Sequence, residues 1–138
     1  MTDFIGLGED VVYSILTRLF SSMKVERQYP ISKIISKDDY DFLDEVYQKH
    51  KFDFAVIHQK ENLDIIFLIV EVNYRHKVTA TKKETNIFGP LLKKYGIQFV
   101  KINDYECDSI FKKNKTSITN DDFIDFFNAL KICGVKLI

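Results

Sequence analysis

The chain has 138 residues, and its composition excludes several classes of protein before any motif is considered. It is 46% hydrophobic and 14% aromatic, and its 20 basic side chains balance 20 acidic ones, so the formal net charge is zero. At this length roughly two-thirds of the surface of the unfolded chain can be buried, so we expect one globular domain with its own core. Disordered and collagen-like chains are excluded. A zero net charge also argues against a protein coated in positive charge for indiscriminate nucleic-acid binding.

Cysteine usage and hydrophobic runs predict a cytoplasmic protein. Cys107 and Cys133 have no zinc-type spacing and are expected to be small core residues in a reducing compartment. The first residues carry an acid where a signal peptide carries bases. The most apolar run, residues 65–70, is much shorter than the ~20 residues that a membrane-spanning helix needs. We therefore expect neither secretion nor a membrane partner.

The secondary structure is predicted from hydrophobic spacing, helices from a 3.6-residue period and strands from short apolar or alternating runs. In chain order we expect a helix over residues 8–23, a strand over 25–31, a helix over 36–47, strands over 52–58 and 65–73, a helix over 79–95, a strand over 97–102, a turn with a short polar helix or loop over 103–115, and a helix from 120. Pro90 should kink or split its helix, and Gly96 should end it. Buried apolar strands need cover on both faces, so the fold class is α/β, with a central mixed β-sheet flanked by helices on both faces.

The two central strands form the clearest hairpin and bring two acids together. With the loop centred on Asn62, facing residues are equidistant from it: Ile57 with Phe67, Ala55 with Ile69, and Asp53 with Glu71. Facing residues have Cβ atoms about 4.5–5.5 Å apart, and two carboxylates that close repel each other unless a proton or a cation lies between them. Alternatively, Asp53 and Glu71 lie solvated at strand ends in a shifted register.

A divalent cation is the functional interpretation of this pair. Carboxylate oxygens suit Mg²⁺ or Mn²⁺, which keep several waters and accept a substrate phosphate as a further ligand. A cation held in this way activates water and stabilises the charge that develops on a phosphodiester during hydrolysis. Zinc chemistry based on histidine is not indicated.

Several segments together resemble the PD-(D/E)XK nuclease superfamily, which has the restriction-endonuclease-like fold. They are the helix beginning at Gly8-Glu9, the strand Phe52–Val56, the strand ending Val70–Asn73, the basic helix after it, and the strand Gly96–Val100. Val70–His76 is similar to the Glu-x-Asp-Gly-x-x-His stretch of the branch related to the very-short-patch repair endonucleases, and Val25–Ile31 resembles the strand before that branch's acidic hairpin. The resemblance implies one nuclease-like domain over 1–138, a restriction-endonuclease-like sandwich with a core of about 8–102 and a C-terminal helical extension over 103–138.

The same resemblance implies roles for individual residues. Asp53 and Glu71 would be metal ligands, and Glu9 would complete or orient the site; from the residues alone, Glu9 could instead complement the helix dipole. The superfamily's lysine, two residues after the second acid, is replaced by Asn73. An asparagine amide can coordinate a metal or orient a water, but it supplies no positive charge.

Basic residues beyond Glu71 are candidates for the missing charge and for contacts with DNA. Lys77, Lys82 or Lys83 could supply the charge, although exposed lysines are ordinarily only solvated. His76 matches the branch's histidine and could act as a general base or be a polar cap. His50 and His58 belong to no motif and are assigned no role. The residues expected to contact nucleic acid are Tyr74, Arg75, Lys77, Lys82 and Lys83.

Three functions follow from these observations. The first is a metal-dependent DNA endonuclease whose catalytic group comprises Asp53, Glu71, Asn73, His76 and Lys83. The second is a catalytically inactive nuclease-fold module that binds nucleic acid or a protein partner, and the basic segment is then equally a lysine-rich solvent face. The third is a subunit that dimerises through its C-terminal apolar stripe, unless that stripe packs within the chain; it comprises Phe123, Phe126, Phe127, Leu130 and the tail Val135–Ile138. A homodimer or a partner protein could supply sequence specificity, since so short a chain has little room for a separate base-reading element.

Overall fold

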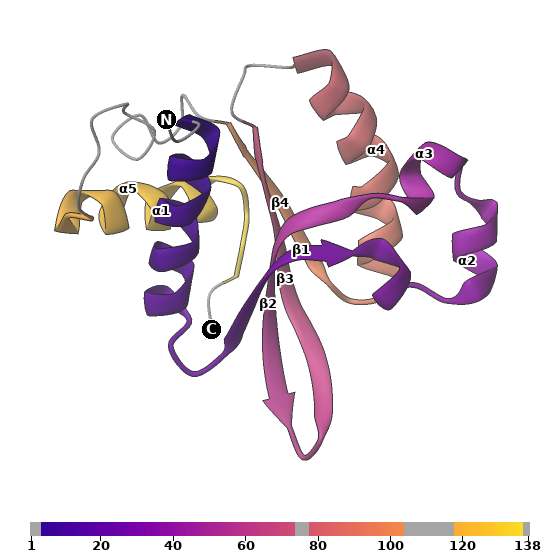
Figure 1. Cartoon of the computed structure of the whole chain (residues 1–138), viewed down its shortest axis with the longest axis horizontal. Helices are drawn as coiled ribbons and strands as arrows, with labels where there is room; N and C mark the ends of the chain where they lie inside the picture. Colours follow the sequence, from indigo (N-terminus) through magenta and orange to yellow (C-terminus); the bar gives the residue numbers. More distant parts are fainter. Residues whose placement is uncertain (1–3, 74–77, 104–117, 137–138) are drawn as a thin grey trace.

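The structure is a computed structural model that describes residues 4–73, 78–103 and 118–136, with side chains for 9–72, 85–102 and 118–136. In chain order its elements are α1 (Phe4–Leu19), β1 (Lys24–Pro30), the short 3-10 helix η1 (Ile31–Lys33), α2 (Lys37–Phe42), α3 (Glu45–Gln48), β2 (Lys51–Lys60), β3 (Leu63–Asn73), α4 (Val78–Lys94), β4 (Gln98–Asn103) and α5 (Asn120–Ile132). The fold is α/β, as predicted (Figure 1). No helix in these ranges is both long and apolar enough to cross a lipid bilayer.

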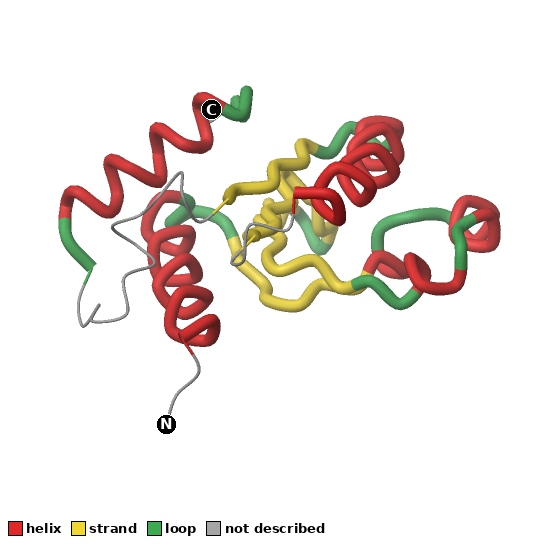
Figure 2. The backbone as a smooth tube through the Cα atoms, turned by 90° about the horizontal axis from the view of Figure 1, so that it is seen from above, coloured by secondary structure: helices red, strands yellow, loops and turns green. Residues whose placement is uncertain are grey.

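The sheet is mixed and has the strand order β1-β2-β3-β4. The first three strands are antiparallel neighbours, and β3 and β4 are parallel. Parallel strands cannot be joined by a tight turn, so the chain crosses over one face of the sheet through α4. Figure 2 shows the result from above: α1 and α5 lie on one side of the sheet and α4 on the other.

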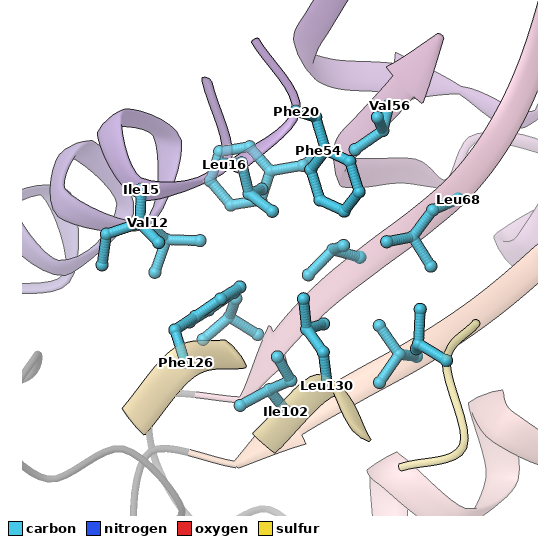
Figure 3. Close-up of a cluster of buried hydrophobic side chains, with 14 of the residues drawn as sticks. Val12, Ile15, Leu16, Phe20, Phe54, Val56, Leu68, Ile102, Phe126 and Leu130 are labelled. Atoms are coloured by element: carbon cyan, nitrogen blue, oxygen red, sulfur yellow. The ribbon is translucent and has the colours of Figure 1, made fainter. Parts of the chain in front are cut away.

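Each face of the sheet has its own hydrophobic cluster. On the α1/α5 face, Val12, Ile15 and Leu16 of α1 meet Phe126 and Leu130 of α5 over the sheet (Figure 3). On the other face, Phe88 and Leu92 of α4 pack on Phe52, Ala55 and Ile69. The predicted cover on both faces is confirmed, and it explains why β2 and β3 read as nearly continuous apolar runs.

The hairpin turn is tighter than predicted. It consists of Glu61 and Asn62 alone, both with positive φ (50° and 69°), which is the backbone that a two-residue type I′ turn requires. Next to the turn Ile57 therefore pairs with Ile66, so its predicted pairing with Phe67 is wrong. A β-bulge adds one residue to β3, and beyond it the predicted register holds, with Ala55 opposite Ile69.

The predicted helix over residues 36–47 is two short helices. Leu43 ends α2 in an extended conformation and Asp44 begins α3. Phe42 is 90% exposed and Val46 is 71% exposed, so neither lies on a buried stripe as expected. Helical spacing predicted one amphipathic helix here, but only part of its apolar stripe is covered: Leu43 and Tyr47 pack against the α4 cluster, and Phe42 and Val46 do not.

Helix α4 runs unbroken through Pro90, so the proline does not split it. Proline lacks the N–H that would bond to the carbonyl four residues back, and at an exposed position water can take that place. Gly96 follows the helix with φ of 72°, as predicted for a C-terminal glycine. Cys133 is exposed rather than in the core, because it follows the last turn of α5 at the surface. Cys107 lies outside the described residues.

Part of the chain's charge cancels within the fold. Lys94 at the end of α4 donates to both carboxylate oxygens of Asp39 in α2 at 2.9 Å. The Tyr95 hydroxyl also donates to Asp39, and it accepts from the Ser36 backbone N–H at 2.8 Å. These contacts tie α2 to α4 and hold the pKa of Asp39 below its usual value, mainly through Tyr95 and then Lys94. Lys94, one of the lysines of the predicted basic helix over 79–95, is therefore engaged.

Two phenylalanines give a matched test of this packing. Phe54 is fully buried and Phe42 is 90% exposed. We expect Phe54→Ala to lower the free energy of unfolding by about 3–5 kcal/mol, because it removes apolar burial and leaves a cavity. Phe42→Ala should change it by less than about 0.5 kcal/mol. Urea unfolding followed by circular dichroism measures both changes. Equal losses of unfolding free energy would contradict the described burial of Phe54 and exposure of Phe42.

Candidate metal and phosphate site

The candidate site lies where β2 and β3 separate. Their pairing ends at Phe54 and Val70. Beyond that point Lys51 and Phe52 pair only with β1, while residues 71–73 pair only with β4. Figure 1 shows the start of β2 leaving toward α3 while the end of β3 stays beside β4. Asp53 and Glu71 are the first residues beyond the last pair, one on each arm of this fork.

At the fork the strands reverse which side chains point to which face of the sheet. Phe52 and Phe54 are two positions apart, yet they pack in the clusters on opposite faces of the sheet. In β1, Arg27 lies over the ring of Tyr13 in α1, whereas Tyr29 packs in the α4 cluster. Gln28 between them has φ of 53°, and the β1–β2 register places it opposite Asp53. Left-handed backbone at a residue other than glycine is strained, and such strain is concentrated at functional sites.

The side chains of the two acids complete the hydrogen bonding of the fork. The backbone N–H of Asp53 donates to Oε1 of Glu71 at 2.8 Å, and the N–H of Val72 donates to Oδ2 of Asp53 at 2.8 Å. Each carboxylate thus takes the place that a neighbouring strand would fill. Glu71 is only 6% exposed, and Asp53 is partly buried. The structure therefore brings Asp53 and Glu71 together and places neither of them at a solvated strand end.

This arrangement favours a proton on Asp53. Burial and then the charge of Glu71 raise the pKa of Asp53 to about 7. The charge of Glu9 adds to this rise, while the Val72 hydrogen bond and His50 act in the opposite direction. The carboxyl group of Asp53 therefore changes its charge near neutral pH.

His50 belongs to the site although no motif indicated it. Its Nε2 lies 3.2 Å from Oε2 of Glu71, and we place the proton on Nε2 because an ionised carboxylate only accepts. The ring is held between Phe88 of α4, with centroids 4.5 Å apart, and Phe52, with centroids 4.8 Å apart. The hypothesis that His50 has no role is therefore not supported by its position, since it orients Glu71. Its only sequence signal was its place just before a strand.

Lys101 is the second residue that the sequence reasoning missed. In the parallel ladder it is the direct neighbour of Glu71 on β4, and parallel strands lie about 4.8 Å apart. Phe99, two residues earlier, packs in the α4 cluster, so alternation places Lys101 on the same face of the sheet. A basic residue thus lies beside Glu71 in the neighbouring strand. The sequence could not reveal this, because the register of a parallel pair is not set by a turn.

Glu9 lies in the interior of α1, because that helix begins at Phe4 and not at Gly8. Complementing the helix dipole at the first turn is therefore not its role. Its Oε1 accepts from Nε2 of Gln28 at 3.1 Å, and Nη2 of Arg27 lies 3.6 Å away. The helix acid is tied to the strained residue opposite Asp53, which is a supporting position.

Other predicted site residues cannot be placed by their side chains. Asn73 ends β3 and lies at the fork by its backbone. Lys82 and Lys83 belong to α4, but their side chains lie outside the described part. The remaining segment, with Tyr74, Arg75, His76 and Lys77, is not described. Their assigned roles stay predictions. His58 is exposed near the hairpin turn, far along β2 from Asp53.

The donor set fits a hard divalent cation. Oδ1 of Asp53 has no hydrogen-bond partner within the described residues, and each oxygen of Glu71 accepts one bond and keeps a further lone pair. In the part of the chain that is described, no group of three or more His, Cys, Asp or Glu side chains is arranged to hold a metal. Two carboxylates with a shell completed by water suit Mg²⁺ and do not make a zinc site.

Comparisons with protein-family models, with curated proteins and with solved structures find no match to this chain. What the site does must therefore be argued from its own geometry.

The raised pKa of Asp53 gives this site a signature in stability. The folded-state pKa of about 7 lies above the ordinary value of 3.8, so the folded protein binds this proton more tightly than the unfolded chain does. The associated stability is full below about pH 4 and is lost as the pH rises through about 7. Asp53→Asn should remove that loss, which is worth about 1.4 kcal/mol per unit of pKa difference.

Urea unfolding at a series of pH values from 4 to 8 measures this effect. Asn keeps an oxygen to accept from Val72, so the fork's hydrogen bonding survives the substitution. Asp41→Asn, at an exposed carboxylate of α2, controls for the chemical change itself. Identical pH profiles for wild type and Asp53→Asn would contradict the described burial of Asp53.

Proposed function

We propose that the chain is a PD-(D/E)XK-type, metal-dependent DNA endonuclease domain that hydrolyses phosphodiesters at the fork of β2 and β3. One observation carries the proposal: the fork uses two carboxylates where two amides would suffice. Gln at 71 and Asn at 53 could accept the same backbone hydrogen bonds without a charge. The chain instead carries acids whose proximity and burial drive the pKa of Asp53 to about 7. The hydrogen bonds do not need this repulsion between the two carboxylates, and a bound cation would relieve it.

The arrangement of elements also supports the proposal. The helix and the strand named in the resemblance lie next to the acidic pair in the fold, because α4 connects β3 to β4 and β4 is the parallel neighbour of β3. A helix acid, Glu9, is tied to β1 beside Asp53. These are the three acids that the resemblance assigns to metal binding and support.

Each described residue has a distinct part in this mechanism. Asp53 and Glu71 would hold Mg²⁺ or Mn²⁺, with Oδ1 of Asp53 as the open donor. A bound Mg²⁺ supplies a Lewis acid that activates a water and stabilises negative charge on the phosphate. His50 fixes the Glu71 carboxylate from the side opposite the Asp53 backbone, and its aromatic neighbours keep the ring in place. Lys101, beside Glu71, is positioned to offset the phosphate charge that Asn73 cannot.

DNA is the proposed substrate because a phosphate backbone matches a cation site bordered by positive charge. The predicted contacts from Tyr74 to Lys83 would extend this surface beyond the fork. Lys94 does not take part, since it is bonded to Asp39.

A second candidate is a nuclease-fold module that binds nucleic acid, or a protein partner, without cutting. The observation in its favour is the small donor set, with Asn73 at the position of the usual lysine and two carboxylates alone at the fork. Such a module would keep salt-dependent DNA binding and lack cleavage.

Cleavage assays with matched variants test the first candidate. Supercoiled plasmid incubated with Mg²⁺ or Mn²⁺ should be cut by the wild type, and Asp53→Asn and Glu71→Gln should lower the rate at least about 100-fold, because the cation's charge stabilisation is lost. Asp41→Asn should cut normally. Independently, Mg²⁺ should raise the melting temperature of the wild type and not that of Asp53→Asn. Absence of both effects would contradict the proposal, and DNA binding without cleavage would support the second candidate.

Lys101 gives a separate test of the charge next to Glu71. Lys101→Met should lower the cleavage rate by about 10²-fold or more with little change in the Mg²⁺-dependent rise in melting temperature. Lys93→Met, an exposed lysine on α4, should leave the rate unchanged. Full activity of Lys101→Met would show that the positive charge comes from another residue.

A further inference from the structure

Gln28 has a left-handed backbone in the middle of a strand, with φ of 53°. Among the described residues other than glycine, only Glu61 and Asn62 share a positive φ, and these two form the hairpin turn that requires it. A strand has no such requirement. A glutamine destabilises the fold at this position relative to a glycine, so we expect it to serve a purpose other than stability.

The left-handed backbone determines which element the Gln28 side chain contacts. Arg27, the residue before it, contacts α1, because its Nη2 lies 2.8 Å from Oδ1 of Asp10. In a regular strand the next side chain points to the opposite face of the sheet. Gln28 instead also contacts α1, since its Nε2 donates to Oε1 of Glu9 at 3.1 Å. Two consecutive residues of β1 thus bond to two consecutive acids of α1, which requires a break in the alternation of the strand.

The Gln28 contact is not needed to attach β1 to α1. Arg27 already attaches them, through its ion pair with Asp10 and its position over the ring of Tyr13. Gln28 itself is exposed, and a single exposed hydrogen bond stabilises a fold by no more than the accompanying backbone strain destabilises it. Stability therefore does not explain the strained glutamine. What the contact does determine is the position of the Glu9 carboxylate.

The Glu9 carboxylate is held close to the fork. Gln28 lies opposite Asp53 in the β1–β2 register, and the charge of Glu9 contributes to the raised pKa of Asp53. The contacts of Glu9 with β1 use its Oε1, and its Oε2 accepts no hydrogen bond from any described residue. A hard divalent cation keeps several of its waters, and neighbouring carboxylates that accept from such ligands orient them. Glu9 offers an oxygen for this purpose.

We propose that Gln28 is a positioning residue of the fork site, which holds the Glu9 carboxylate beside Asp53 with Oε2 open to a water of the bound cation. The inference rests on the proposed function, because the cation belongs to that proposal. Gln28 touches neither the cation nor the phosphate and acts only through Glu9. An amide suits this task, since it donates to a carboxylate without neutralising its charge.

Two glycine substitutions separate this role from the relief of strain. Gln28→Gly and Glu61→Gly each place glycine at a left-handed position, so neither should lower the urea midpoint of the metal-free protein. Only Gln28→Gly removes the donor to Glu9. With supercoiled plasmid and Mg²⁺, its kcat should fall about 10-fold or more while KM for DNA stays unchanged, and Glu61→Gly should cut as the wild type does. Gln28→Met, which keeps the side-chain length without a donor, should lose as much kcat as Gln28→Gly.

A double-mutant cycle tests whether Gln28 acts through Glu9. In a Glu9→Ala background, Gln28→Met should cause no further loss of kcat, because the carboxylate that Gln28 positions is absent. A further loss as large as in the wild-type background would show that Gln28 contacts the substrate directly, and it would overturn the positioning role.

The remaining outcomes separate this inference from the proposed function. Unchanged cleavage by Gln28→Gly and Gln28→Met would overturn the inference and leave the proposed function in place. A urea midpoint of Gln28→Gly below that of the wild type would assign the bond to Glu9 to the stability of the fold, which also overturns the positioning role. A wild type that cuts no DNA with Mg²⁺ or Mn²⁺ would overturn the proposed function and this inference with it.

Discussion

The separation of β2 from β3 is the constraint on which the rest of the molecule depends. Where two strands part, backbone N–H groups lose their partners, and a buried N–H without a partner costs about 1–3 kcal/mol. Here the Glu71 and Asp53 side chains accept from the N–H groups of Asp53 and Val72. The two side chains stabilise the separated strands, and the same two hydrogen bonds fix the positions of the carboxylates. The hydrogen bonds that hold the fork are therefore also those that orient the candidate site.

The two hydrophobic clusters allow β2 and β3 to separate, because beyond the fork each strand is held by different elements. The β2 arm pairs with β1, and β1 reverses its faces at Gln28, so that Arg27 stays over Tyr13 of α1 while Tyr29 joins the α4 cluster. The β3 arm keeps its pairing with β4. Each arm is packed independently, so the acids between them are preorganised before any ligand arrives. Carboxylates fixed in this way are suited to hold a divalent cation, and in the proposed function that cation would supply the positive charge that faces a phosphate.

Much of the fold could be predicted from the sequence, because hydrophobic spacing reports which face of an element is buried. The apolar run of β3 and the glycine after α4 have the positions expected, and the helix expected over 8–23 is present as α1 at Phe4–Leu19. Exposed segments were predicted less well. Phe42 and Val46 follow helical spacing without any partner surface, so the pattern predicted one buried stripe where two short, exposed helices lie.

The candidate site was predictable only as far as one hairpin determines it. Asp53 and Glu71 were found from the turn. They do not pair directly, because the pairing ends at Phe54 and Val70, but the bulge in β3 compensated for the tighter turn and left both acids as the first residues beyond the last pair. His50, Gln28 and Lys101 could not be found in this way. His50 reaches Glu71 from a loop, Gln28 has left-handed backbone without being glycine, and Lys101 depends on a parallel register. None of these relations has a short-range sequence signal.

Carboxyl ¹³C NMR of Asp53 is the measurement that most directly tests the central proposal, namely that a divalent cation replaces the proton that the fork holds. Without divalent cation the Asp53 resonance should titrate with a pKa of about 7. With saturating Mg²⁺ the pKa should fall by more than one unit, because the cation favours the ionised carboxylate. An Asp53 carboxyl that titrates near its ordinary value, or whose titration does not respond to Mg²⁺, would contradict the account.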